Sequence, residues 1–142
     1  MNSFDPCARA AALSCWSGPV TPEPLKGGIT NANFVVTDRG RRHFVRIGDD
    51  ISVHGILRFH ELAASRAAAA TGLSPAVLHQ EPGAVVFQYI DGRTYAADDV
   101  RQPANLRRIL PLVQRCHREM PKYFRGPALI FWVFQIFRDY AQ

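Results

Sequence analysis

The sequence lacks the features that mark membrane-spanning and secreted proteins. Its most apolar run, Ala128 to Phe137, is too short to cross a bilayer and is interrupted by Gln135. The N-terminus has no basic segment followed by an apolar core, as a signal peptide would. The three cysteines are odd in number and form no C-x-x-C motif, which favours a reducing compartment over a disulfide framework. We therefore expect a cytoplasmic protein without a membrane span.

Signatures of nucleic-acid binding are absent as well. No aromatic residues alternate with basic ones, and no zinc-ligand spacing is present. The net charge of +5 allows an anionic partner, but its densest cluster is only Arg39, Arg41 and Arg42, typical of a solvated hairpin tip. The chain has 142 residues, 47% of them hydrophobic and 20% charged, as expected for one small globular unit. We expect no nucleic-acid partner.

What the sequence does contain is a glycine turn, which we define as residues 25–33, directly before an apolar run. Adjacent Gly27 and Gly28 let the backbone approach a ligand closely and present N–H groups to an anion. The spacing fits neither a Walker loop nor G-x-G-x-x-G. An ordinary turn between two strands is therefore an equal interpretation. The candidate binding residues of the turn are Gly27, Gly28, Thr30, Asn31 and Asn33.

Two strands joined by a tight turn are predicted next, over residues 34–37 and 43–47. In the second strand Phe44 and Arg46 share one face, and Val45 and Ile47 share the other. An arginine in a short apolar strand lies either on an exposed face of the sheet or in a binding site. Both interpretations of Arg46 stay open at this point.

The clearest predicted helix covers residues 52–71. Ser52 can cap its start and Gly72 supplies the left-handed residue after its end. Glu61 lies beside the apolar face, so it either points toward the sheet or pairs with Arg58 or Ser65 at the surface. The predicted apolar face consists of Ile56, Phe59, Leu62, Ala63 and Ala67.

A short N-terminal helix is predicted over residues 5–16, capped by Asp5 and ended near Gly18. A second hairpin is predicted around Glu81-Pro82-Gly83 and ends at Asp91. A helix from Pro103 follows, with a kink or break at Pro111. Its predicted core face is Leu106, Ile109, Leu110 and Val113, and His117 is interpreted as a packed core histidine rather than a catalytic one.

The segment 129–140 is aromatic on every side of a helix. It packs either on this domain or against something outside this chain, and we favour the second.

In this order, the elements resemble the small lobe of a protein-kinase-like α+β fold, an antiparallel sheet with one main helix. The details resemble the choline/ethanolamine kinase branch of the aminoglycoside phosphotransferase family. The matching pieces are Gly27 to Asn31, Phe44 to Gly48, Arg58 to Glu61, Ala68 to Pro75 and Gln88 to Arg93. The resemblance covers roughly residues 23–142.

The resemblance implies that residues 27–33 cover the phosphates of ATP. Arg46 takes the place of the strand lysine that contacts the α- and β-phosphates, with Glu61 as its helix partner. The backbone of Gln88, Tyr89 and Ile90 corresponds to the hinge that hydrogen-bonds adenine. The implied partners are ATP and a small-molecule alcohol acceptor, choline or a related amino-alcohol.

One part of the family pattern is missing. The family holds Mg²⁺ and orients the attacking hydroxyl with a His-Gly-Asp-x-x-x-x-Asn-like loop and a later Asp, and neither occurs in this sequence. The Mg²⁺ ligands are therefore expected in a part of the large lobe that this chain lacks, and no catalytic or metal-binding residue is assigned here. We expect this chain alone to be an inactive, truncated kinase.

The resulting division is 1–22 as an N-terminal extension, 23–92 as the ATP-binding small lobe, and 93–142 as the first helices of a truncated large lobe. Two alternatives remain: a non-catalytic module that binds nucleotide or a partner, and a kinase for an aminoglycoside, thiamine or homoserine. Self-association or contact with the missing lobe through residues 129–140 is the expected role of the tail.

Overall fold

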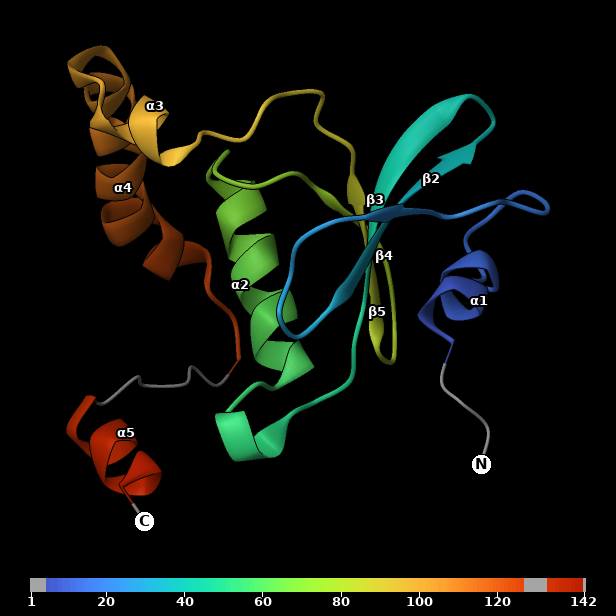
Figure 1. Cartoon of the computed structure of the whole chain (residues 1–142), viewed down its shortest axis with the longest axis horizontal. Helices are drawn as coiled ribbons and strands as arrows, with labels where there is room; N and C mark the ends of the chain where they lie inside the picture. The colour runs from blue at the N-terminus through green and yellow to red at the C-terminus, as the bar shows by residue number, and fades with distance from the viewer. Residues whose placement is uncertain (1–4, 127–132, 142) are drawn as a thin grey trace.

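The computed structural model describes residues 5–126 and 133–141 and has an α+β fold built on a five-stranded antiparallel sheet (Figure 1). The strand order is β1-β2-β3-β5-β4. Both predicted hairpins are confirmed, and their turns contain Gly40 and Gly83 at positive φ. The strands are β1 (Glu23–Leu25), β2 (Ala32–Asp38), β3 (Arg41–Ile47), β4 (Val77–Glu81) and β5 (Ala84–Gln88).

The two faces of the sheet differ, because side chains alternate along each strand. One face carries Val45 and Ile47 and forms the hydrophobic core with Ala10 and Leu13 of the N-terminal segment. The opposite face carries Arg46, which pairs with Glu61 of helix α2 (Arg58–Ala70). Helix α1 (Pro6–Ala11) lies on the other side of the sheet from α2 (Figure 1). The predicted alternation along β3 is therefore confirmed.

Helix α1 begins as predicted and ends early. The Asp5 carboxylate accepts a hydrogen bond from the Cys7 N–H at 2.9 Å, and Pro6 is the first helical residue. The helix ends at Ala11, so the predicted end near Gly18 is wrong. After the helix, Leu13 is buried in the core together with Ala10. The predicted division of the chain into an N-terminal extension (1–22), a small lobe (23–92) and the start of a large lobe (93–142) stays a prediction.

Helix α2 also starts later than predicted. Residues Ser52–His54 form a short 3-10 turn, followed by Gly55 in the left-handed conformation with φ 66°. A bridge between Ile51 and Ile56 then turns the chain, so Ser52 does not cap α2. The Arg58 N–H instead donates to the Asp50 carboxylate at 2.7 Å.

The predicted end of α2 is confirmed. Gly72 has φ 71°, and its N–H donates to the Ala69 carbonyl while the Leu73 N–H donates to the Ala68 carbonyl. This is the paired bonding of a Schellman cap. The predicted apolar face is only partly buried: Ala67 is in the interior, Phe59 is exposed, and Ile56 lies outside the helix.

Helices α3 (Ala97–Arg101) and α4 (Pro103–Tyr123) follow the sheet, and α4 lies beside α2 (Figure 1). The helix is not broken at Pro111, although a kink or break was predicted. The carbonyl left without its donor belongs to Arg107, an exposed residue, so water can satisfy it.

Two predictions about the burial of α4 are wrong. His117 is exposed rather than packed in a core. Of the predicted core face only Ile109 is half-buried, whereas Leu106, Leu110 and Val113 are exposed. Among the described elements α4 contacts α2 and α3, and these contacts leave Leu106, Leu110 and Val113 exposed.

Helix α5 (Val133–Tyr140) carries the described part of the aromatic tail, and residues 129–132 lie outside the described part. Phe137 and Tyr140 are exposed. The Tyr140 hydroxyl lies 3.2 Å from His54 Nδ1, and the two rings are stacked. Within the described residues, no helix combines the length and apolar character needed to cross a bilayer.

Candidate functional site

The glycine turn joins β1 to β2 and depends on both glycines. Gly27 and Gly28 have φ angles of 107° and 97°, which side-chain-bearing residues rarely adopt. A Cβ on Gly28 would lie 2.8 Å from Asn33 Nδ2 and 3.0 Å from the Asn31 carbonyl oxygen. The Asn33 amide donates to the Gly27 carbonyl at 2.9 Å. Asn33 therefore holds the shape of the turn, a structural role that its sequence position alone did not reveal.

Arg46 on β3 and Glu61 on α2 form an ion pair, with Nη1 and Oε1 separated by 2.6 Å. Both side chains are about one-third exposed, so the pair borders solvent rather than lying in the core. The guanidinium also lies near the Phe44 and Phe87 rings, 5.8 and 5.5 Å from their centroids. Of the two interpretations of Arg46, the structure supports the one in which it faces a candidate site.

Glu61 both points toward the sheet and pairs with Arg58, so the two interpretations of its position hold together. Its second oxygen, Oε2, accepts a hydrogen bond from Arg58 Nη1 at 2.8 Å while Oε1 pairs with Arg46. One carboxylate thus receives two guanidinium groups, one from its own helix and one from the sheet. Such charge-assisted bonds fix the orientation of both arginines.

Beside this pair lies a hollow of about 470 Å³ between the glycine turn, the start of α2 and the β4–β5 hairpin. Arg46 Nε and Asn31 Oδ1 are buried atoms on residues that line it, and neither has a hydrogen-bond partner within the described structure. Buried polar groups are normally satisfied, so these two atoms are candidates to meet a ligand. The guanidinium N–H is suited to an anionic oxygen.

The predicted hinge begins at Gln88, the last residue of β5. The Gln88 N–H donates to the Ala76 carbonyl at 2.9 Å and is therefore already engaged. A base at this edge would have to use the Gln88 carbonyl or the backbone of Tyr89 and Ile90. The Tyr89 ring packs under the Arg42 guanidinium, 4.3 Å from its centroid, which fixes the start of the segment.

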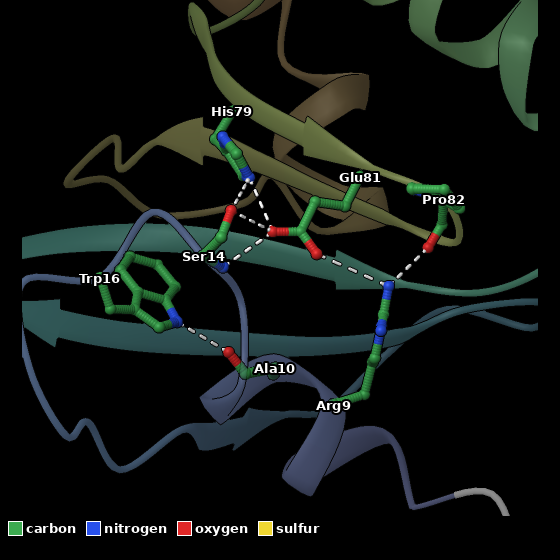
Figure 2. A network of polar contacts seen from close by, with 7 residues as sticks. All are labelled: Arg9, Ala10, Ser14, Trp16, His79, Glu81 and Pro82. Atoms are coloured by element: carbon green, nitrogen blue, oxygen red, sulfur yellow. Dashed lines mark hydrogen bonds and ion pairs between the residues drawn. The ribbon is translucent and has the colours of Figure 1, made fainter.

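The structure also assembles a polar cluster that sequence reasoning missed, consisting of Arg9, Ser14, His79 and Glu81 (Figure 2). Glu81 Oε1 accepts from the Ser14 N–H at 2.8 Å and the Ser14 hydroxyl at 2.7 Å, and it lies 2.9 Å from His79 Nε2. These bonds lower the pKa of Glu81 to about 2, with the contact to His79 as the largest cause. No sequence motif signals this cluster, because Arg9 and Ser14 are 65 or more residues away from His79 and Glu81.

The cluster holds a serine, a histidine and a carboxylate but is not a nucleophilic triad. In a triad the serine and the carboxylate meet different ring nitrogens. Here Ser14 Oγ and Glu81 Oε1 both approach Nε2 of His79, at 3.5 and 2.9 Å. Arg9 adds a hydrogen bond of 2.9 Å to the Pro82 carbonyl (Figure 2). The arrangement clamps the N-terminal segment to the β4–β5 hairpin.

No metal centre is assembled by the residues that the structure describes, since no three of their His, Cys, Asp or Glu side chains gather to hold an ion. Asp49 and Asp50 line the hollow beside Glu61. The Asp50 carboxylate, however, is engaged with the Arg58 N–H.

Comparison with known proteins relates this arrangement to phosphoryl transfer. A family model described as the phosphotransferase enzyme family matches residues 21–130. No curated protein matches the sequence. Among solved structures, the Plasmodium vivax ethanolamine kinase is similar, with a TM-score of 0.61 and 18% identity over 70% of this chain. The match covers only 27% of that kinase.

The family match includes the glycine turn, the Arg46–Glu61 pair and the hinge. The similarity to the ethanolamine kinase extends this to the fold, a five-stranded sheet with the helix α2 beside it. The chain therefore belongs to the phosphotransferase enzyme family, and its fold is similar to part of the ethanolamine kinase structure.

Proposed function

We propose that this chain is the ATP-binding part of a kinase that phosphorylates the hydroxyl of choline or a related amino-alcohol. The Arg46–Glu61 pair beside the glycine turn carries the proposal. A guanidinium fixed by a carboxylate presents its remaining donors to phosphate in a constant geometry, and the buried, unpaired Nε of Arg46 is such a donor.

In this proposal the glycine turn covers the phosphates, with Gly27, Gly28, Thr30, Asn31 and Asn33 as the covering residues. Tyr89, Ile90 and the Gln88 carbonyl receive the adenine. Mg²⁺ accompanies ATP, and its ligands come from outside this chain, because the sequence has no loop that matches the family's metal-binding residues. The three free cysteines fit a cytoplasmic setting.

The amino-alcohol acceptor is proposed from the likeness to an ethanolamine kinase, and aminoglycoside, thiamine and homoserine are the competing acceptors. Turnover by the 142-residue chain alone is not expected. ADP formation that depends on choline or ethanolamine would contradict this expectation.

Exposed apolar side chains on α4 and α5 suggest a contact surface for another part of the kinase. Leu106, Leu110 and Val113 are spaced to share one helical face, and all three are exposed. We propose that this face and the tail of residues 129–140 contact the rest of a large lobe, or a second copy of the chain when that lobe is absent.

Titration calorimetry with ATP tests the binding proposal. Wild-type protein should bind ATP, and Arg46→Ala should weaken that binding by about tenfold or more, as expected for loss of a charged hydrogen bond. Arg41→Ala is the matched control, because Arg41 is an exposed arginine of the same strand. Equal ATP affinity of Arg46→Ala and wild type would reject Arg46 as the phosphate contact, and no binding by wild type would reject the proposal.

A further inference from the structure

Arg58, the first residue of α2, links three separate parts of the candidate site. Its Nη2 donates to the Thr30 carbonyl of the glycine turn at 3.0 Å. Its Nε donates to the Asp49 carbonyl, between β3 and α2, at 2.7 Å. Its Nη1 donates to Glu61 Oε2 at 2.8 Å. The side chain is only 15% exposed, and its bonds to Thr30 and Glu61 are partly buried.

The surrounding backbone is closely packed around this side chain. Gly48 follows β3, and a Cβ there would lie 2.9 Å from Arg58 Nη2 and 3.1 Å from the Thr30 carbonyl oxygen. The turn, the end of β3 and the Arg58 guanidinium therefore meet without room for another carbon atom. A change in the position of Arg58 has to move the glycine turn as well.

Glu61 connects Arg58 to the phosphate-binding arginine. Because Arg58 occupies Oε2, only Oε1 is available to Arg46. Without Arg58, the carboxylate could rotate and accept two donors of the Arg46 guanidinium, as carboxylates and arginines commonly do. Arg46 would then have fewer donors left for a phosphate.

We propose that Arg58 is a positioning residue for the phosphates of the nucleotide. It fastens the glycine turn to α2 and limits Glu61 to a single bond with Arg46. The proposal rests on the proposed ATP-binding function. Arg58 also lines the hollow beside the Arg46–Glu61 pair, and its bonds to Thr30, Asp49 and Glu61 are what assign it a positioning role. The proposal requires a selective effect, since binding of the phosphates should depend on Arg58 and binding of the base should not.

The test compares ATP with adenosine, which lacks phosphates, in titrations of the full 142-residue chain. Arg58→Ala should bind ATP about tenfold more weakly and adenosine about as well as wild type does, so the ratio of the two affinities falls. Arg66→Ala is the matched control, because Arg66 is an exposed arginine on the same helix. A ratio that stays at the wild-type value in Arg58→Ala would overturn the proposal.

If Arg58→Ala does not fold, Arg58→Lys is the variant to compare with wild type in the same titrations. A lysine ammonium keeps the charge but cannot span both carbonyls and the carboxylate as the planar guanidinium does. We expect an intermediate fall in the ATP-to-adenosine ratio, and an unchanged ratio would again overturn the proposal.

A measurement without ligand distinguishes the failure of this proposal from the failure of the proposed ATP-binding function. If wild-type protein binds neither ATP nor adenosine, the proposed function fails. Hydrogen exchange of the amides of residues 28–31 still tests the fastening of the turn. These amides should exchange several-fold faster in Arg58→Ala than in Arg66→Ala, and equal rates would refute the role of Arg58.

Discussion

At the scale of single residues, the candidate site is closely packed around the backbone of several of its glycines. Gly48 illustrates this better than the two glycines of the turn, because its backbone conformation needs no glycine. A Cβ at this position would lie 2.6 Å from Asn31 Oδ1, in addition to its approach to Arg58 and Thr30. The residue is small because three parts of the site converge on it.

We predict that Gly48→Ala lowers the free energy of unfolding by about 1–3 kcal/mol, the usual cost of inserting a carbon atom into a full site. It should also weaken ATP binding, since the turn has to move away from β3. Thermal and urea denaturation measure the first effect and calorimetry the second. Gly18→Ala is the control, because a Cβ there has nothing within 4 Å. If both variants unfold alike, the crowding around Gly48 has no energetic importance.

The same scale explains which site residues the sequence could identify. Gly27 and Gly28 were candidates because of their residue type, whereas the roles of Arg46 and Glu61 were implied by the resemblance to the kinase family. As nucleotide contacts, all four stay predictions. Arg58 was seen only as a surface partner of Glu61, because its bonds to the carbonyls of Thr30 and Asp49 depend on a turn and a loop that are distant in sequence. Backbone acceptors have no signature in a sequence.

At the scale of elements, the N-terminal segment packs on the sheet and supports it. Ala10 and Leu13 belong to the core of the sheet, and the polar cluster around Glu81 fastens the segment to the β4–β5 hairpin. That hairpin also forms one wall of the candidate hollow through Gln80 and Gly83. The segment therefore supports the site without contributing a predicted binding residue.

The stabilising effect of this clamp should depend on pH. The pKa of Glu81 is lowered from 4.5 to about 2 in the folded protein, so the folded state favours the charged carboxylate. Its contribution is complete above about pH 4.5 and declines as the pH falls toward 2. Glu81→Gln should therefore lower the melting temperature clearly at pH 7 and much less at pH 3.

Glu119→Gln is the control for this measurement, because Glu119 pairs with Lys122 on the surface of α4, where an ion pair contributes little. A melting-temperature difference between Glu81→Gln and wild type that is equally large at both pH values would show that the charge of Glu81 is not what stabilises the clamp.

At the scale of the whole molecule, the most prominent feature is apolar surface on α4 that no described element covers. Leu110 is 58% exposed and Leu106 is 46% exposed, and the two are one helical turn apart on α4. Apolar side chains exposed together on one helix face usually mark an interface.

We predict that the isolated chain self-associates through this face. The double variant Leu106→Gln, Leu110→Gln should shift sedimentation velocity profiles toward monomer and reduce binding of a hydrophobic dye. Leu78→Gln is the control, since Leu78 is similarly exposed but lies on β4. A wild-type chain that stays monomeric at all concentrations would contradict the prediction.

The sequence by itself determined the elements whose signals are local. The two hairpins, the Asp5 cap and the Gly72 end of α2 follow from turn and capping residues, and the alternation along β3 follows from strand geometry. The order of these elements, together with the resemblance of motifs such as Gly27 to Asn31 and Gln88 to Arg93 to the kinase family, predicted the fold class and the phosphotransferase family.

Tertiary structure decided the features that depend on what packs where. It ended α1 at Ala11, moved the start of α2 to Arg58, and left one face of α4 exposed. It also brought Arg58 to the glycine turn and Ser14 to Glu81. The physical reason is that helix propensity and periodicity act over a few residues, whereas burial and hydrogen bonding to distant backbone carbonyls are determined only when the chain is folded.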